Sequence, residues 1–277
     1  MTDTRRSKPL ECICGGRDLE MIFSYDKPLP IEVQLKLPEG VPYRRHYKVC
    51  KFCGHFIGFH DFDLSSLYEE AYVNGTYGGS EGVRQTFLKI IGLPKEKSDN
   101  AGRVKRINEY AQKHYGQDWR GRLLDVGSGL GVFPYAMKNT GWDCVALDPD
   151  ERSIENIKQN AGVEGVQGDF LKIDYVNLGR FDAITFNKVL EHVEHPVAML
   201  SRAKNLLKQS GFVYAEVPDV AAASEGKTRE EFGVDHYHVF SPASLAMMCE
   251  RAGLSISEIE RVREPSTKFT LRAFCTL

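Results

Sequence analysis

Long hydrophobic segments are absent from this chain of 277 residues: no apolar run approaches the ~18–20 residues of a membrane-spanning helix. An excess of charge of one sign is also absent, since 36 Lys and Arg stand against 38 Asp and Glu. This balance excludes a strongly basic protein, so we expect neither a membrane nor a nucleic acid as partner. The first nine residues are polar, with no apolar secretion segment after them, so we expect a cytoplasmic location.

Cysteine is unevenly placed, with four of the seven residues in the first fifth of the chain. The sequence Cys-Lys-Phe-Cys-Gly at 50–54 has the C-x-x-C-G form of a zinc knuckle, whereas Cys12 and Cys14 are one residue closer together. Clustered cysteines in a reducing compartment more often bind metal than form disulfides. We therefore predict a structural zinc site formed by Cys12, Cys14, Cys50 and Cys53. Free cysteines, or one ligand replaced by a histidine, remain as alternatives; the candidate histidines are His46, His55 and His60.

Strand and helix patterns alternate from Arg122 onward, which predicts a doubly wound, mostly parallel α/β sheet. One such pair is a helix over 196–210 followed by a strand over 212–219. Two strand-like runs at the C-terminus predict an antiparallel hairpin at the sheet edge. The Tyr- and Gly-rich stretch 67–79 is expected to form a lid.

A glycine-rich turn follows the first predicted strand of this region, in the sequence Leu-Leu-Asp-Val-Gly-Ser-Gly-Leu-Gly. Gly127, Gly129 and Gly131 allow a tight turn and a close approach of the backbone to a ligand. Asp148 ends the second strand, where a carboxylate can accept both ribose hydroxyls of a nucleoside. Asp169 follows the third strand and is placed to accept from an adenine amino group. These acids predict a nucleoside site at the carboxyl edge of the sheet.

The glycine spacing excludes a dinucleotide fingerprint, because the last glycine of G-x-G-x-x-G would fall on Val132. The turn is also preceded by Asp125, which would repel a pyrophosphate. An acid at this position suits a ligand that carries an ammonium group near the loop.

The ordered motifs "LLDVGSGLG", "ALDPD", "QGDF", "FDAITFNKVLEHV" and "LLKQSGFVYAEVP" resemble those of class I S-adenosylmethionine-dependent methyltransferases. The resemblance implies a seven-stranded sheet with a reversed last strand, and S-adenosyl-L-methionine as the cofactor. It also implies roles for individual residues along the cofactor. The methionine part is assigned to Asp125, Gly127, Ser128, Gly129 and Gly131, the ribose to Asp148 and Pro149, the adenine to Asp169 and Phe170, and the surroundings of the sulfonium to Asn187 and Lys188.

With this resemblance, three regions are expected along the chain. They are a zinc-binding N-terminal β domain at 1–62, a helical lid or linker at 63–120 and a methyltransferase domain at 121–277. The N-terminal part resembles the zinc-ribbon head of some methyltransferases of sugar and natural-product pathways. Sugar C-methyltransferases carry a further C-terminal domain, and this chain ends directly after the sheet, which favours an oxygen or nitrogen acceptor. The oligomeric state is not indicated.

Histidines are the candidates for a general base, because a hydroxyl or ammonium acceptor must lose a proton. We predict His192, after the fourth strand, and His236, after the fifth, as catalytic residues. Alternation along the chain favours His236 over His238 as the residue that faces inward. A structural role, in which His192 only hydrogen-bonds a backbone carbonyl, remains open.

A metal site is the alternative reading of these residues, since Glu191, His192 and His236 offer ligands for a divalent ion. The arrangement resembles the RNA 2′-O-methyltransferases that modify small-RNA 3′ ends. In that family a second Glu stands where this chain has Lys188, which removes one ligand. The sequence therefore predicts, first, methyl transfer to an oxygen or nitrogen of a small polar metabolite, and second, metal-assisted RNA 2′-O-methylation.

Overall fold

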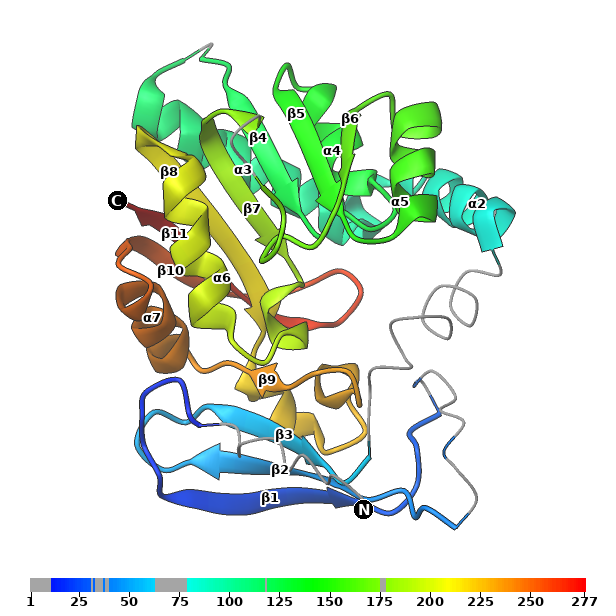
Figure 1. Cartoon of the computed structure of the whole chain (residues 1–277), viewed down its shortest axis with the longest axis vertical. Coiled ribbons are helices and arrows are strands. Elements are labelled where there is room, and N and C mark those ends of the chain that lie inside the picture. The colour runs from blue at the N-terminus through cyan, green and yellow to red at the C-terminus, as the bar shows by residue number, and fades with distance from the viewer. Residues whose placement is uncertain are drawn as a thin grey trace.

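A computed structural model describes residues 11–30, 32, 37, 40–62, 79–117, 119–174 and 178–277 of the chain. Most of the predicted lid at 67–79 therefore lies outside the described residues. The described part contains two β-sheets, a large sheet and a smaller N-terminal sheet, which lie one above the other in Figure 1. No described helix is both long enough and apolar enough to cross a membrane.

The large sheet has seven strands in the order β10-β11-β8-β7-β4-β5-β6. All neighbours from β8 to β6 are parallel, and β11 runs antiparallel to both of its neighbours. The reversed last strand and the terminal hairpin at the sheet edge are thus confirmed. The strands are β4 (Arg122–Val126), β5 (Asp143–Asp148), β6 (Glu164–Gln167), β7 (Phe181–Asn187), β8 (Leu207–Pro218), β10 (Ser255–Arg263) and β11 (Phe269–Thr276).

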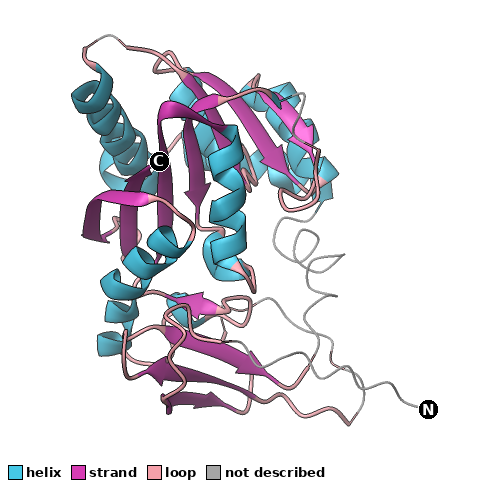
Figure 2. Ribbon diagram, turned by 60° about the vertical axis from the view of Figure 1, so that its left-hand side comes forward, coloured by secondary structure: helices cyan, strands magenta, loops and turns pink. Residues whose placement is uncertain are grey.

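Helices cover both faces of the large sheet (Figures 1 and 2). Alternate strand residues point to opposite faces, so Leu123 belongs to one hydrophobic cluster and Leu124 to the other. The helices α2, α3, α4 and α5 pack on the face of Leu123, and α6 and α7 on that of Leu124. The helices are α2 (Gly79–Ile91), α3 (Asp99–Tyr115), α4 (Val132–Lys138), α5 (Glu151–Asn156), α6 (Pro196–Ala203) and α7 (Pro242–Arg251).

Helix boundaries follow local capping signals. Ser98 caps α3 by accepting a hydrogen bond from the amide of Ala101, and Gly116 ends that helix at a φ of 100°. Ser241 and Ser244 form a reciprocal capping box at the start of α7.

The helix predicted over 196–210 is too long: α6 ends at Ala203, and β8 already begins at Leu207. Leu207 pairs with Phe181, and the register shifts before the main pairing between Ala183 and Phe212. Strand pairing therefore replaces the last turns of the predicted helix.

The N-terminal sheet has the strand order β1-β2-β3-β9. Its strands are β1 (Leu19–Tyr25), β2 (Arg45–Cys50), β3 (Phe56–His60) and β9 (His238–Val239). The fourth strand comes from the chain after β8, so the N-terminal sheet is completed by a segment that the prediction assigned to the methyltransferase domain. The predicted domain boundaries at 62 and 120 stay predictions.

The segment 219–241 runs from β8 to α7 and connects the two sheets. It contains the short 3₁₀ helices η7 (Val220–Glu225) and η8 (Glu230–Phe232) as well as β9. Its Phe232 is fully buried in a cluster with Tyr47 and Phe56 of the N-terminal sheet. Other short helical turns are η2 (Lys95–Lys97), η3 (Ile157–Ala161), η5 (Leu190–His192) and η6 (Lys204–Leu206).

Candidate functional site

The predicted glycine turn lies between β4 and α4, at the carboxyl edge of the large sheet. A Cβ on Gly127 would come within 2.6 Å of Val189 Cγ2, and a Cβ on Gly131 within 2.6 Å of Ile157 Cγ1. Gly129 differs from both, because nothing lies within 4 Å of the position its Cβ would take. The absence of a side chain at Gly127 and Gly131 thus lets the turn pack closely against Val189 and Ile157. At Gly129 the absence of a side chain leaves open space that a ligand can occupy.

Asp125 lies near the carboxyl end of β4, two residues before Gly127, and its side chain is 1% exposed. Its Oδ1 accepts hydrogen bonds from Thr185 Oγ1 and Asn187 Nδ2, each at 2.7 Å. Burial raises the pKa of the Asp125 carboxyl to about 6. The Ser128 hydroxyl donates to the backbone carbonyl of Asp125 at 2.8 Å. The buried Oδ1 of Asn187 has no partner among the described residues, so the pocket offers a free acceptor beside Asp125.

Asp148 ends β5 and faces the same turn. Its Oδ2 accepts from the amide of Gly129 at 2.8 Å, and its Oδ1 accepts from the amide of Asp150 at 2.9 Å. Burial raises the pKa of Asp148. Two backbone amides thus fix the Asp148 carboxylate beside Gly129. The next residue, Pro149, is exposed.

Asp169 and Phe170 follow β6 and have different surroundings. The Asp169 side chain is 39% exposed and pairs with Lys172 at 2.9 Å. The ring of Phe170 is 3% exposed and packs against Phe186, with 5.8 Å between ring centroids. Asp169 is thus available at the edge, but the ring of Phe170 is part of the core. Stacking of the Phe170 ring on adenine stays a prediction, and the burial of the ring against Phe186 does not support it.

A buried charge cluster beside the glycine turn was not predicted from the sequence. Glu216 of β8 is fully buried and accepts from Arg103 Nε of α3 at 2.9 Å and from Tyr214 at 2.6 Å. Arg272 of β11 lies 3.4 Å from the same carboxylate. Despite burial, these cations hold the pKa of Glu216 well below its ordinary value. Nothing in the sequence distinguishes Arg103 from the other basic residues of its helix.

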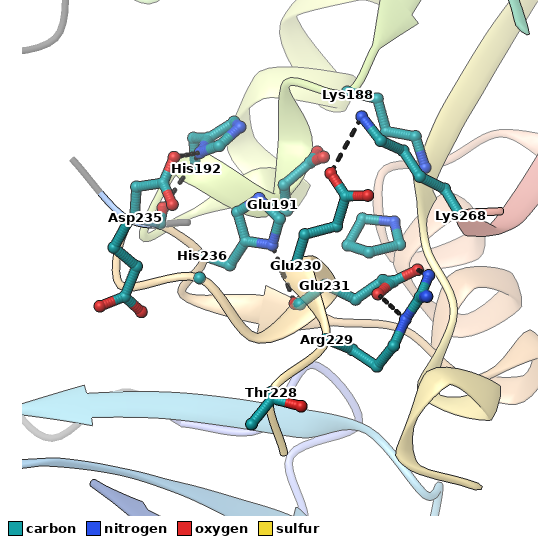
Figure 3. A pocket seen from close by; sticks show the side chains of 13 residues that line it. Lys188, Glu191, His192, Thr228, Arg229, Glu230, Glu231, Asp235, His236 and Lys268 are labelled. Atoms are coloured by element: carbon teal, nitrogen blue, oxygen red, sulfur yellow. Dashed lines mark hydrogen bonds and ion pairs between the residues drawn. The ribbon is translucent and has the colours of Figure 1, made fainter. Parts of the chain in front are cut away.

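A polar cavity of about 660 Å³ lies between the carboxyl edge of the large sheet and the N-terminal sheet (Figure 3). Among the described residues that line it, none is a Phe, Tyr or Trp. The lining comes from five separate parts of the chain. It consists of Glu32, Lys188, Glu191, His192, Pro218, Thr228, Arg229, Glu230, Glu231, Gly233, Asp235, His236 and Lys268.

Both predicted catalytic histidines line this cavity. His192 Nδ1 lies 3.0 Å from the carbonyl oxygen of Asp235, and His236 Nδ1 lies 2.9 Å from that of Glu231. A carbonyl oxygen only accepts, so each Nδ1 carries a proton, and each Nε2 of the neutral ring keeps its lone pair. The two rings meet edge to face with 4.8 Å between centroids. The arrangement thus supplies two bases side by side.

His238 faces away from the cavity, which confirms that His236 is the inward residue. His238 is 1% exposed, and its Nδ1 lies 3.0 Å from Nε2 of the fully buried His55. His195 is exposed at the start of α6 and makes no side-chain cap.

Glu191 and Lys188 complete the inner end of the cavity. Glu191 is 1% exposed, and its Oε2 has no hydrogen-bond partner among the described residues. One ligand atom from each of Glu191, His192 and His236 lies within 4.8 Å of the others. Lys188 has a φ of 59°, which is uncommon for a residue other than glycine, and its Nζ donates to Thr270 Oγ1 at 2.9 Å. Burial lowers the pKa of this lysine.

The four N-terminal cysteines come together as predicted. Their sulfur atoms all lie within 4.8 Å of one another, with Cys12–Cys53 and Cys12–Cys14 distances of 3.4 Å. Zinc–sulfur bonds of about 2.3 Å in a tetrahedron place neighbouring sulfurs about 3.8 Å apart, so the cluster has the size of a four-thiolate zinc site. The alternative in which a histidine replaces one thiolate has no support for His55, because its Nδ1 contacts Ser244 Oγ at 3.1 Å.

The family model described as a methyltransferase domain matches residues 96–259, which is more than half of the chain. The chain belongs to this methyltransferase family. The matched region contains the glycine turn, Asp148, Asp169 and both catalytic candidates.

Curated relatives of this methyltransferase carry the name ubiquinone biosynthesis O-methyltransferase. The protein of Neisseria meningitidis serogroup C (strain 053442) is 28% identical over 204 residues, covering 66% of this chain and 85% of the relative. The protein of Xanthomonas axonopodis pv. citri (strain 306) is 29% identical over 153 residues, covering 50% of this chain and 64% of the relative.

Among solved structures, the methyltransferase is similar to magnesium protoporphyrin IX methyltransferase from Synechocystis PCC 6803 with bound S-adenosylhomocysteine. The TM-score is 0.56 at 15% identity, covering 75% of this chain and 99% of the other. A second match is 1,6-didemethyltoxoflavin-N1-methyltransferase from Burkholderia thailandensis, with a TM-score of 0.51 at 19% identity, covering 80% of this chain and 94% of the other. These likenesses concern the fold. Together with the family match, they confirm the predicted class I S-adenosylmethionine-dependent methyltransferase.

Proposed function

We propose that this methyltransferase transfers the methyl group of S-adenosylmethionine to an oxygen or nitrogen of a small polar metabolite of the sugar or natural-product type. The observation that carries the proposal is the cavity beside the cofactor edge, whose described lining is charged or polar except for Pro218 and Gly233. The relatives' name as O-methyltransferases supports an oxygen acceptor.

The residues at the carboxyl edge fit the cofactor. Asn187 Oδ1 is a buried acceptor without a partner among the described residues, and Asp125 is a carboxylate beside it, so the pair suits the ammonium group of the methionine part. We assign Asp148 to the ribose and Asp169 to the adenine, as the resemblance implies. The open side of Gly129 leaves room between them.

Bound S-adenosylmethionine supplies an activated methyl group, so the protein has to align the acceptor and remove its proton. His192 and His236 each keep an Nε2 lone pair because their Nδ1 atoms donate to backbone carbonyls. Asp235 Oδ2 lies 3.4 Å from His192 Nδ1 and stabilises the positive charge that the ring gains on accepting a proton. Either histidine can thus act as the general base.

The test is release of S-adenosylhomocysteine in the presence of a panel of sugars, amino sugars and phenols. Loss of a general base costs about 10²–10⁴-fold in rate, so we expect His192→Ala combined with His236→Ala to lower turnover by that factor. The affinity for S-adenosylhomocysteine, measured by calorimetry, should not change. Full turnover in the double variant, with His192→Ala and His236→Ala combined, would contradict the proposed base.

A second candidate, metal-assisted methyl transfer, is favoured by the approach of Glu191, His192 and His236 within 4.8 Å. These three groups suit a divalent ion, which would act as a Lewis acid on the acceptor oxygen. An RNA acceptor is the finer form of this candidate, but of the lining cations Arg229 and Lys268 are paired with acids and Lys188 donates to Thr270. Stoichiometric Mn²⁺ binding that is lost in Glu191→Gln, with activity lost to a chelator, would establish the metal. Unchanged activity in chelator would rule it out.

We also propose that the four cysteines hold a structural zinc ion. Four thiolates at these distances fit a closed tetrahedral site, which has no open position for chemistry. Metal analysis of the purified protein tests the proposal: one zinc per chain is expected, and none should remain after Cys50→Ser combined with Cys53→Ser. Retention of zinc in this variant would overturn it.

A further inference from the structure

The polar cavity also carries information on the charge of the acceptor, because most of its charged groups are already paired with each other. Arg229 lies 2.9 Å from Glu231, and Lys268 lies 3.1 Å from Glu230 (Figure 3). The third lining cation, Lys188, donates to Thr270. An anionic acceptor would therefore find Arg229 and Lys268 already paired with acids, and the remaining lining cation, Lys188, already donating to a hydroxyl.

Not every carboxylate that lines the cavity has a charged partner. Glu32 pairs with Arg45, and Asp235 lies 3.4 Å from His192. Glu191 differs from them, since its Oε2 is buried without a hydrogen-bond partner among the described residues. Lys188 is a nearby opposite charge, but its ammonium is turned to Thr270, and no ion pair joins it to Glu191 within the described part of the chain. A buried carboxylate oxygen without a partner is costly unless a ligand supplies a donor.

Glu191 is also placed to meet the acceptor. It lines the cavity in the turn η5, directly before His192, and its ligand atom lies within 4.8 Å of those of both histidines. A donor group of the acceptor held by Glu191 would thus keep the rest of the molecule beside the bases. This placement makes Glu191 a group that selects the acceptor, apart from the bases that take its proton.

We infer that the acceptor is an uncharged or cationic molecule whose amine or hydroxyl group donates to Glu191, and that phosphate- and carboxylate-bearing acceptors are rejected. The inference rests on the proposed function and narrows its substrate class. An ammonium group satisfies the carboxylate best, since charge-assisted hydrogen bonds are stronger than neutral ones. A hydroxyl group comes second. An anion would be repelled by Glu191, and it would have to compete with acids for Arg229 and Lys268 or with the Thr270 hydroxyl for Lys188.

The test uses full-length protein saturated with S-adenosylhomocysteine and three probes of similar size, namely D-glucosamine, D-glucose and D-glucose 6-phosphate. Saturation-transfer NMR titrations should show the order glucosamine, then glucose, then glucose 6-phosphate. A charged hydrogen bond contributes about 1.5–3 kcal/mol, which corresponds to a preference of about tenfold or more for the amine. Glu191→Gln should abolish this preference while S-adenosylhomocysteine binds as before.

Glu230→Gln is the matched control, because it removes an acid of the same cavity that already has a partner. This variant should keep the preference for glucosamine. It should also strengthen the binding of glucose 6-phosphate, because Lys268 is then freed.

Three results would overturn the inference. They are binding of glucose 6-phosphate in preference to glucosamine, an amine preference that survives in Glu191→Gln, and no binding of any probe. A wild-type Mn²⁺ site that depends on Glu191 would also overturn it, because the carboxylate would then serve a metal. Protein that fails to bind S-adenosylhomocysteine would instead contradict the proposed function itself, so the two failures can be told apart.

Discussion

The cofactor edge and the polar cavity lie next to each other but are built in different ways. The cofactor edge comes from successive strand ends, and its polar groups bind amides of the same stretch, as Asp148 does with Gly129. The polar cavity joins Glu32, the turn after β7, the segment 219–241 and Lys268 of the terminal hairpin. A local motif can thus specify cofactor binding, whereas binding of the acceptor depends on how segments far apart in the sequence pack together.

The same contrast holds for the two sheets. The large sheet is stabilised by two extensive hydrophobic clusters, one on each face. The cluster around the cysteines contains Cys12, Cys50, Cys53 and Ile57 as its buried members. Such a small core needs a metal or a partner surface to stay folded. The N-terminal sheet has such a partner surface, since β9 and Phe232 come from the 219–241 segment, and the proposed zinc ion would supply the metal.

The largest effect is expected from the double substitution Cys50→Ser and Cys53→Ser. Structural zinc contributes on the order of 10 kcal/mol in small zinc modules, so the N-terminal sheet should lose its protection from hydrogen exchange. The large sheet should stay folded and should still bind S-adenosylhomocysteine. Hydrogen exchange with mass spectrometry, together with calorimetry, measures both. Collapse of the whole chain in one transition would show that the two sheets are not separable.

The next largest effect is expected from Gly127→Ala. The new methyl group would lie 2.6 Å from Val189 Cγ2 at a φ of +70°, so both overpacking and backbone strain oppose it. Together they cost about 2–4 kcal/mol, and the distorted turn should bind S-adenosylhomocysteine about 100-fold more weakly. Calorimetry measures the loss.

Gly226→Ala is the matched control for this substitution, because it combines a φ of +93° with nothing within 4 Å of the added atom. It should lower stability slightly and leave affinity unchanged. Equal losses of affinity in both variants would mean that strain alone, and not the contact with Val189, is responsible.

An effect of about 3 kcal/mol is expected from the pH dependence of Asp125, whose pKa is raised by burial to about 6 from an ordinary value of 3.8. Between pH 4 and 6 the folded state holds a proton that the unfolded state has lost, so this group's contribution to stability falls as pH rises. Affinity for S-adenosylhomocysteine should change in the opposite sense, rising toward pH 7 as the carboxylate becomes charged. Asp125→Asn should flatten both profiles relative to wild type. Unchanged profiles would contradict the raised pKa.

The smallest effect, about 1–3 kcal/mol, is expected from Tyr47→Phe, which sharpens the comparison at the contact of the two sheets. The buried Tyr47 hydroxyl lies 2.9 Å from the carbonyl of Gly233 and 2.8 Å from that of His236. Its loss should raise hydrogen exchange over 228–238 without changing the affinity for S-adenosylhomocysteine.

Tyr25→Phe is the control for this prediction, since it removes a hydroxyl that donates to the backbone carbonyl of Lys227 at 2.8 Å, outside the cavity lining. It should leave exchange around His236 unchanged. If both variants behaved alike, the N-terminal sheet would not position His236 through Tyr47.

The sequence alone determined the features that depend on neighbouring residues. Alternating strands and helices indicated the doubly wound sheet, and the terminal runs indicated the hairpin. The cofactor motif could be predicted because the glycine turn and the acids at the ends of successive strands lie close together in the sequence. The clustering of the four cysteines could be predicted for a similar reason, since the spacing of cysteine pairs in the sequence is typical of metal sites.

Tertiary structure alone decided the features that depend on segments far apart in the chain. It ended α6 at Ala203, because pairing with β7 extends β8 back to Leu207. It also buried the ring of Phe170, joined Arg103 to Glu216 and brought Glu32 and Lys268 to one cavity. Such contacts leave no periodic pattern in the sequence, since their free energy arises only when the two sheets and the segment between them are packed together.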